Sequence, residues 1–244
     1  MSDFDRNYAA ARGAGFGRAV AVDAGLRAYM LRVYNYMAIG VALTGVAAWG
    51  VFQLAATNPA FQQTLFGTPL YWVLLLAPLG LVFFLSFRIQ HLAVETARAL
   101  FFFYAALLGV SLAPIFMVYT GASIARVFFI SAASFGALSL YGYTTQRDLS
   151  AFGSFLIMGL FGIILASLVN IFLASSALQF VISVVGVLVF AGLTAWDTQR
   201  IKEMYDVSDD GTIAGRKAVM GALSLYLDFI NLFLMLLRLF GDRR

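Results

Sequence analysis

Two aspartates occupy positions where a membrane helix would bury them. Asp228 lies within "SLYLDFINLF" (residues 224–233), and no basic residue is found within nine positions on either side of it. Asp197 lies near the end of another apolar run, "VLVFAGLTAWDTQRIKEMY" (187–205), 31 residues earlier in the chain. An aspartate at the bilayer centre costs about 2.5–3.5 kcal/mol on insertion scales, so it faces a bundle interior and needs a partner. Two carboxyl groups in contact share a proton, because both cannot ionise cheaply. The pair therefore predicts a proton-sensitive latch.

Polar neighbours of the two acids suggest a site rather than isolated charges. Thr194 precedes Asp197 by three residues and Asn231 follows Asp228 by three, so each lies on the same helix face as its acid. Arg88, which ends the second apolar segment, is a candidate charged partner. Because hard cations prefer oxygen ligands, Asp197 and Asp228 are also candidate ligands for a passing calcium ion.

Each acid also has a plainer interpretation. Asp197 could be an ordinary helix-end residue, paired at the membrane interface with Arg200 or Lys202. Asp228 could make only a structural hydrogen bond to another helix. The residues alone leave both alternatives open.

The composition requires elements that cross a membrane. Of the 244 residues, 62% are hydrophobic and 11% are charged, whereas soluble domains are about a quarter charged. A helix needs about 20 apolar residues to span the hydrocarbon. Seven segments qualify, and we expect an all-α membrane protein with a polar cytosolic tail (1–29) and one transmembrane domain (30–244). The segments are 31–56, 70–90, 99–120, 126–146, 151–174, 177–200 and 218–240.

Lysine and arginine positions orient these segments. Twelve basic residues lie before or at the start of the first segment, or at the end of or after the even-numbered ones. One, Arg126, lies after the third segment, at the start of the fourth. This asymmetry predicts a cytosolic N-terminus, with the 57–69 and 174–177 loops outside. The basic C-terminus permits a crossing seventh helix or a re-entrant one, and the length of 218–240 favours the crossing.

Several function classes are disfavoured. The chain has no cysteine and a single histidine, His91, which argues against thiolate chemistry and histidine-based metal sites. Zinc-protease helices, phosphate loops and nucleophile elbows are absent from the sequence. The acid motifs also differ from the glycine-rich ones of intramembrane aspartyl proteases. The basic residues are scattered rather than clustered, which is not a nucleic-acid signature. We expect a protein that is not an enzyme and has no cofactor.

Four segments resemble the Bax inhibitor-1 family, the transmembrane Bax-inhibitor-motif proteins, in its bacterial branch. They are "GVSLAPIF" (109–116), "LSLYGYTTQRDLS" (138–150), "AWDTQRIKEMY" (195–205) and "ALSLYLDFINLFLMLLRLFGDRR" (222–244). The resemblance implies seven helices with the last one central, ringed by the other six. It also implies a multi-pass protein of the bacterial inner (plasma) membrane, in contact with the lipid bilayer and associated with the stress response.

The resemblance implies two functions. The first is a pH-sensitive calcium (cation) leak channel or exchanger, in which Asp197 and Asp228 form the pH-sensing pair and calcium or protons are the species bound. Arg88 is the nearest match to an arginine that latches onto the pair in a bacterial relative. The alternative is a regulator that binds and restrains a membrane-bound ATP-dependent protease.

Overall fold

The structure, a computed structural model, describes the backbone of residues 3–244 and the side chains of residues 24–244. Seven helices are long and apolar enough to cross a membrane, which confirms the predicted all-α class. In chain order the elements are α1 (Asp3–Thr57), α2 (Pro59–Phe66), α3 (Leu70–Arg88), the 3₁₀ turn η1 (Ile89–His91), α4 (Val94–Leu112), α5 (Ile115–Val118), α6 (Gly121–Thr144), α7 (Ser150–Leu173), α8 (Ser176–Glu203) and α9 (Gly211–Phe240).

The predicted polar tail, residues 1–29, lies largely outside the described side chains. Its last part, residues 24–29, belongs to the first membrane-spanning segment, Ala24–Thr57. Tyr29 and Met30 are already buried in the core, so the first segment enters the protein interior earlier than the apolar run suggests. An apolar window misses this start because Arg27 and Arg32 interrupt it, while helical packing tolerates charged residues on the outer face.

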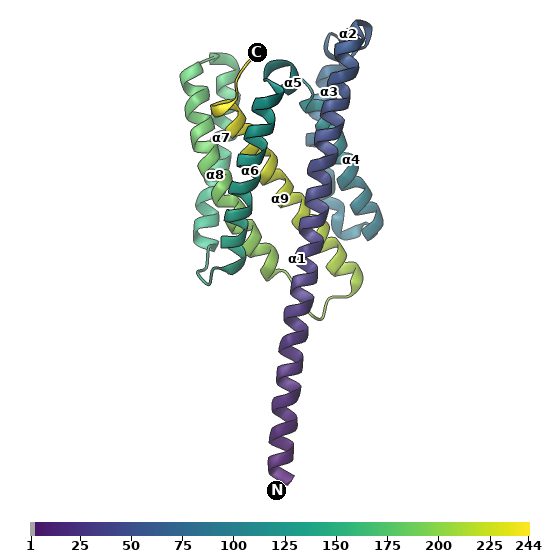
Figure 1. Cartoon of the computed structure of the whole chain (residues 1–244), viewed down its shortest axis with the longest axis vertical. Coiled ribbons are helices and arrows are strands. Elements are labelled where there is room, and N and C mark those ends of the chain that lie inside the picture. Colours follow the sequence, from purple (N-terminus) through teal and green to yellow (C-terminus); the bar gives the residue numbers. More distant parts are fainter. Residues whose placement is uncertain (1–2) are drawn as a thin grey trace.

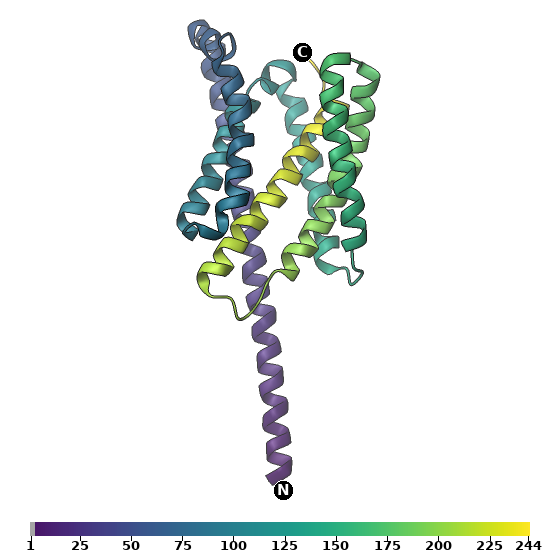
Figure 2. The same ribbon diagram turned by 180° about the vertical axis from the view of Figure 1, so that it is seen from behind.

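The last helix, α9, runs obliquely through the middle of the bundle. Figures 1 and 2 show it crossing between α1–α4 on one side and α6–α8 on the other. It packs against α8, α1, α6 and α4. Within its most apolar stretch, 72% of the residues are buried, against 11% for α3 and for α7. This confirms the predicted central position of the last helix.

The surrounding helices do not contribute equally to the ring around α9. Helix α3 packs chiefly on α4, and α7 packs chiefly on α8, so both form an outer layer. Their exposed side chains are large and apolar, as expected for surfaces that face lipid. Large parts of α3 and α7 therefore face the membrane rather than α9.

Helices α8 and α9 continue beyond the predicted membrane segments. Helix α8 ends at Glu203 with Arg200 and Lys202 in its last turn, where positive charge complements the helix dipole. Helix α9 begins at Gly211 because the Asp210 side chain accepts a hydrogen bond from the Ile213 N–H, at 2.7 Å. The basic residues at 216–217, expected in a loop, therefore lie in the first turns of α9.

The connections between helices differ in part from the expectation. The predicted 57–69 loop contains the short helix α2, which Asn58 caps and Pro59 starts. The predicted turn at 174–177 is confirmed: Ala174 adopts a left-handed conformation with φ 47°, and Ser175 caps α8. The Asn170 side chain accepts a hydrogen bond from the Ser175 N–H at 3.0 Å, which closes this turn.

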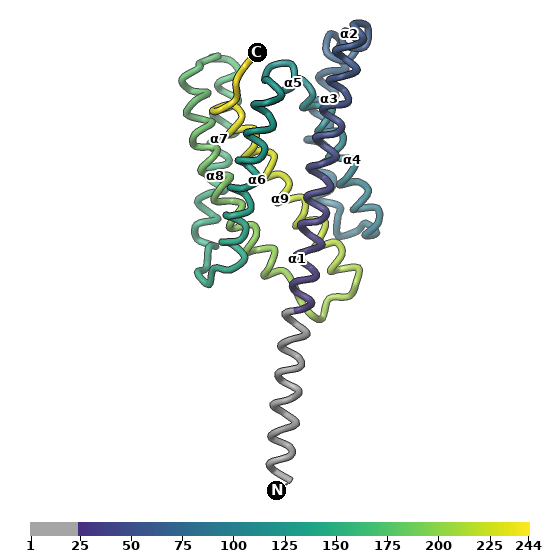
Figure 3. The backbone as a smooth tube through the Cα atoms, in the orientation of Figure 1, coloured from purple at the N-terminus to yellow at the C-terminus, as the bar shows by residue number. Residues whose placement is uncertain are grey.

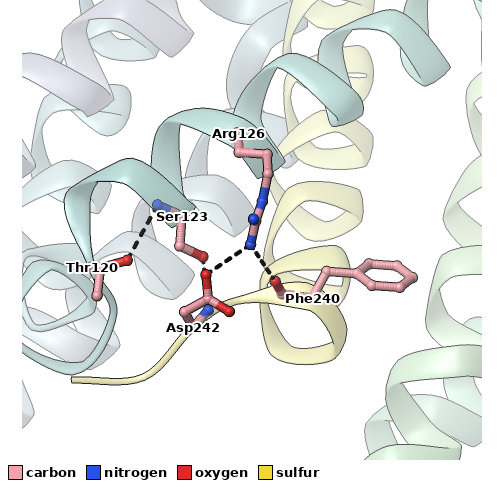
Figure 4. Close-up of polar contacts among 5 residues, drawn as sticks. All are labelled: Thr120, Ser123, Arg126, Phe240 and Asp242. Atoms are coloured by element: carbon pink, nitrogen blue, oxygen red, sulfur yellow. Dashed lines mark hydrogen bonds and ion pairs between the residues drawn. The ribbon is translucent and has the colours of Figure 1, made fainter.

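The C-terminus is fixed at the end of the bundle opposite to the α8–α9 loop, as the backbone path shows (Figure 3). The Thr120 N–H donates to the Asp242 carbonyl and the Arg244 N–H donates to the Val118 carbonyl, at 3.0 and 2.9 Å. Arg126 forms a salt bridge of 2.8 Å with Asp242 and also donates to the Phe240 carbonyl (Figure 4). Helix α9 therefore crosses the whole bundle, as its length predicted, rather than turning back.

Candidate functional site

The structure brings Asp197 and Asp228 together. Asp228 is only 4% exposed and Asp197 is partly buried, and their carboxyl groups lie within hydrogen-bonding distance of each other. A hydrogen bond between two carboxyl groups requires a proton on one of them, since two carboxylates only accept. A direct hydrogen bond between Asp197 and Asp228 therefore requires one shared proton.

One carboxyl oxygen of Asp228 has no hydrogen-bond partner within residues 24–244. Its Oδ2 atom is buried and has no hydrogen-bond partner among the described residues. A buried polar atom without a partner costs about 1–3 kcal/mol, which a bound proton or a cation could offset. Asp228 is thus the less satisfied acid of the two, at the more buried position.

Close packing of α8 on α9 sets the distance between the two acids. A Cβ on Gly186 would meet the Met235 Cγ at 2.9 Å, and a Cβ on Gly221 would meet the Ile201 Cγ2 at 3.0 Å. These glycines lie on either side of the acid pair along the two helices. These two glycines thus allow α8 and α9 to pack closely on both sides of the carboxyl groups along the helices.

Among the described residues, the basic side chains near Asp197 do not form a salt bridge with it and contact other groups instead. Arg200 is close enough to act on Asp197 electrostatically, but its guanidinium lies 5.4 Å from the centre of the Trp196 ring. Lys202 donates to the Tyr143 carbonyl at 2.9 Å. None of the salt bridges within residues 24–244 includes Asp197. The plainer interpretation, an interfacial pair with Arg200 or Lys202, is therefore not what the structure contains.

The structure does not bring Arg88 to the acids. Its side chain is exposed at the end of α3, and no salt bridge within residues 24–244 includes it. The physical reason lies in the layers of the bundle, because α3 packs on α4 in the outer layer while Asp197 and Asp228 lie on α8 and α9. Arg88 does not latch this pair in the observed conformation.

Thr194 and Asn231 do not support the acids directly either. The Thr194 hydroxyl donates to the Phe190 carbonyl at 2.8 Å, and the Asn231 amide donates to the Leu227 carbonyl at 2.8 Å. Both side chains therefore satisfy carbonyl groups of their own helix. The Asn231 amide keeps further hydrogen-bonding capacity beyond this bond, and the residue lines a cavity.

A chain of hydroxyl groups beside the acids was not predicted. The Tyr34 hydroxyl lies 2.6 Å from the Ser139 Oγ, which lies 2.9 Å from the Thr198 Oγ1. Thr198 in turn donates to the Thr194 carbonyl at 2.7 Å. This chain links α1, α6 and α8 at the residue that follows Asp197. The only signal in the sequence was the threonine in "AWDTQR", since Tyr34 and Ser139 approach it through tertiary packing alone.

Gln199 adds a second contact that the sequence did not reveal. Its side chain donates to the Arg147 carbonyl at 2.8 Å and accepts from the Leu149 N–H at 2.9 Å, which fixes the α6–α7 loop to the end of α8. Other acids at this end have structural roles. Hydrogen bonds from the Ser150 side chain and N–H hold the pKa of Asp148 below its usual value, and those from the Ser208 N–H and hydroxyl lower the pKa of Asp206.

The described residues contain no larger cluster of metal ligands. Within residues 24–244, no group of three or more His, Asp or Glu side chains is close enough to hold a metal ion. The acid pair therefore supplies two carboxyl groups only. Two carboxylates suit a transiently bound cation that keeps part of its water shell better than a permanently caged calcium ion, which takes six to eight oxygen ligands.

Comparison with known proteins places this geometry in a family. Residues 26–244 match the family model described as "Inhibitor of apoptosis-promoting Bax1". The chain is 50% identical over 224 residues to the inner membrane protein YbhL of Escherichia coli K12, covering 91% of this chain and 94% of that protein. It is 46% identical over 255 residues to an uncharacterized protein of Caulobacter vibrioides, with all of both chains covered. With seven membrane-spanning helices, a central last helix and a match over nearly its whole length, the chain belongs to the Bax inhibitor-1 family.

Proposed function

We propose that this protein is a pH-sensitive calcium (cation) leak channel or exchanger of the bacterial inner membrane, gated by Asp197 and Asp228. The observation that supports it is the contact between two membrane-depth carboxyl groups on neighbouring helices, one with an unpartnered oxygen. The inner membrane location is inferred from the seven apolar helices together with the likeness to YbhL, which is named as an inner membrane protein.

The proton provides the switch in this proposal. At lower pH one proton bridges the carboxyl groups and holds α8 against α9. At higher pH both groups ionise, and like-charge repulsion in a low-dielectric interior pushes the helices apart. A divalent cation that enters between the carboxylates relieves this repulsion, so ionisation and cation entry are coupled.

The test is calcium flux into proteoliposomes that contain the purified full-length protein, measured across a pH series. Asp228→Asn keeps the size and hydrogen-bonding capacity of the side chain but removes its titration. We expect this substitution to flatten the pH dependence of flux, because an amide can bridge to Asp197 at every pH. Asp197→Asn should have the same effect, and the double variant should add little, since the two acids act as one unit.

Asp206→Asn is the matched control. Asp206 lies in the α8–α9 loop, and its lowered pKa keeps it ionised throughout the neutral range. Its removal should therefore leave the pH profile unchanged. The proposal fails if both Asp197→Asn and Asp228→Asn retain the wild-type profile.

Regulation of a membrane-bound ATP-dependent protease is the second candidate. It has no support from the geometry and rests on the family resemblance alone. A purified protein that carries no calcium at any pH would favour this role over transport.

A further inference from the structure

A cavity of about 720 Å³ lies between α7, α8 and α9 at the end of the bundle that holds the C-terminus. It is separate from the acid pair, although Asn231, one turn beyond Asp228, forms part of its wall. The size falls within the range of ordinary small-molecule sites. The cavity exists because α7 packs chiefly against α8 and leaves this part of α9 uncovered.

The lining of this cavity is polar and charged at one end and mostly apolar away from it. Arg238, in the last turn of α9, and Gln179, in the first turn of α8, line it near the end of the bundle that holds the C-terminus. Asn170 lies below them near the end of α7, and Leu160 lies ten residues earlier on the same helix, about 15 Å deeper. One end of the cavity thus offers hydrogen-bond donors and a positive charge, while the rest of the lining is apolar except for Ser167 and Asn231.

Arg238 is available to a ligand. Its side chain is exposed, and no carboxylate within residues 24–244 pairs with it. The nearest acid in the sequence, Asp242, is bound to Arg126 instead. Arginine matches the geometry of a phosphate group, and the amides of Gln179 and Asn170 add polar groups to the same end of the cavity.

The side of the cavity opens towards lipid. Ile164, Leu168 and Ile171 line it from α7, and each is about half exposed or more, at 46%, 51% and 73%. A water-soluble anion would satisfy Arg238 but would leave the deep apolar part empty. A molecule with a phosphate head and a hydrocarbon chain satisfies both parts.

We propose that this cavity is a binding site for one anionic phospholipid, with its phosphate on Arg238 and an acyl chain along α7 and α9 towards Leu160. The inference is independent of the proposed transport function, because it concerns a different cavity and its test measures binding rather than flux.

Native mass spectrometry of the purified full-length protein tests it, with phosphatidylglycerol and phosphatidylcholine of identical chains as probes. The wild type should bind phosphatidylglycerol more tightly than phosphatidylcholine. Arg238→Gln should weaken phosphatidylglycerol binding about fivefold, the size expected for a partly exposed ion pair, and leave phosphatidylcholine binding unchanged. Arg244→Gln, which removes the same charge at the same end of the bundle but outside the cavity, should leave both affinities unchanged.

A second variant tests the apolar part without altering charge. Ser167 lines the cavity wall on α7, and Ser167→Phe should fill the space and weaken binding of both lipids. Equal binding of the two lipids by the wild type would overturn the proposal, as would equal losses in Arg238→Gln and Arg244→Gln. Glycerol phosphate, which has the head but no chain, should not compete; competition at the same concentration would identify a simple anion site and also overturn it.

Discussion

The two aspartates differ in how well the protein satisfies them. Asp197 is partly buried, has the electrostatic influence of Arg200 and lies beside the hydroxyl chain that begins at Thr198. Asp228 is nearly inaccessible, and one of its oxygens has no partner among the described residues. In the proposed latch, loss of the shared proton leaves Asp228 with the larger unbalanced charge, so we expect the two acids to respond to pH as a unit.

This difference predicts that stability depends on pH. In the proposed latch the folded pair holds a proton that the unfolded chain releases above pH 5. The folded state then binds more protons, and its stability falls as pH rises. The wild type should therefore melt at a lower temperature at pH 8 than at pH 6, and Asp228→Asn should show a smaller difference. Intrinsic-fluorescence melting in detergent measures this. A wild-type melting temperature that rises between pH 6 and pH 8 would contradict the shared proton.

Glycine residues allow two pairs of helices in this protein to pack closely. A Cβ on Gly142 of α6 would lie 2.1 Å from the Ala195 carbonyl oxygen of α8, and one on Gly109 of α4 would lie 2.4 Å from the Thr44 carbonyl oxygen of α1. Both neighbours are backbone atoms, which cannot move without shifting a helix. Small residues at such crossings are typical of membrane bundles, where packing rather than water exclusion holds helices together. The α6–α8 contact also positions Ser139 against Thr198.

Alanine substitutions at two glycines of α6 should distinguish the effect of close helix packing on stability from the effect of helix propensity. Gly142→Ala should destabilise the protein by about 1–3 kcal/mol, because the added methyl group overlaps backbone. Gly136→Ala is the control: it lies on the same helix, and an added Cβ there would meet nothing within 4 Å. It should have little effect or stabilise slightly, since alanine favours a helix over glycine. Equal melting temperatures for the two variants would show that α6 does not approach α8 this closely.

The whole molecule is asymmetric from end to end. One end holds the α8–α9 loop with its partly buried Lys217–Asp209 salt bridge and the hydrogen-bonded α6–α7 loop. The opposite end holds α2, the α7–α8 turn and the C-terminal residues bound to α6 (Figures 1 and 4). Most basic residues of the described part, residues 24–244, lie at the first end, so the positive-inside rule predicts that this end faces the cytosol.

Cysteine labelling tests this orientation, and the natural chain contains no cysteine that would interfere. A single cysteine at Thr64 in α2 or at Arg244 should react with a membrane-impermeant reagent added from outside, whereas one at Ser2 should react only after the membrane is opened. The unmodified chain is the blank. Labelling at Ser2 but not at Thr64 would mean that the protein has the opposite orientation.

The sequence by itself determined the architecture, because a lipid environment restricts the possible solutions. Each apolar run of about 20 residues must be a helix that satisfies its own backbone, so seven runs gave seven spans. Helix ends were less predictable, since the ends of α8 and α9 lie in water, where capping by Asp210 and charge in the last turn decide them rather than hydropathy.

The candidate site was likewise predictable only in part. The cost of a buried charge singles out Asp197 and Asp228 from their own segments, and the short link between consecutive helices makes their contact foreseeable. Contacts with residues from distant segments could not be predicted from the sequence. Arg88 was expected to bind the acid pair and does not, whereas Tyr34 and Ser139 were not expected near Thr198 and form its hydroxyl chain. These partners, and the cavity beside Arg238, could be found only in the tertiary structure. They depend on which helices lie in the outer layer and on how α9 is tilted, and no local sequence pattern encodes either property.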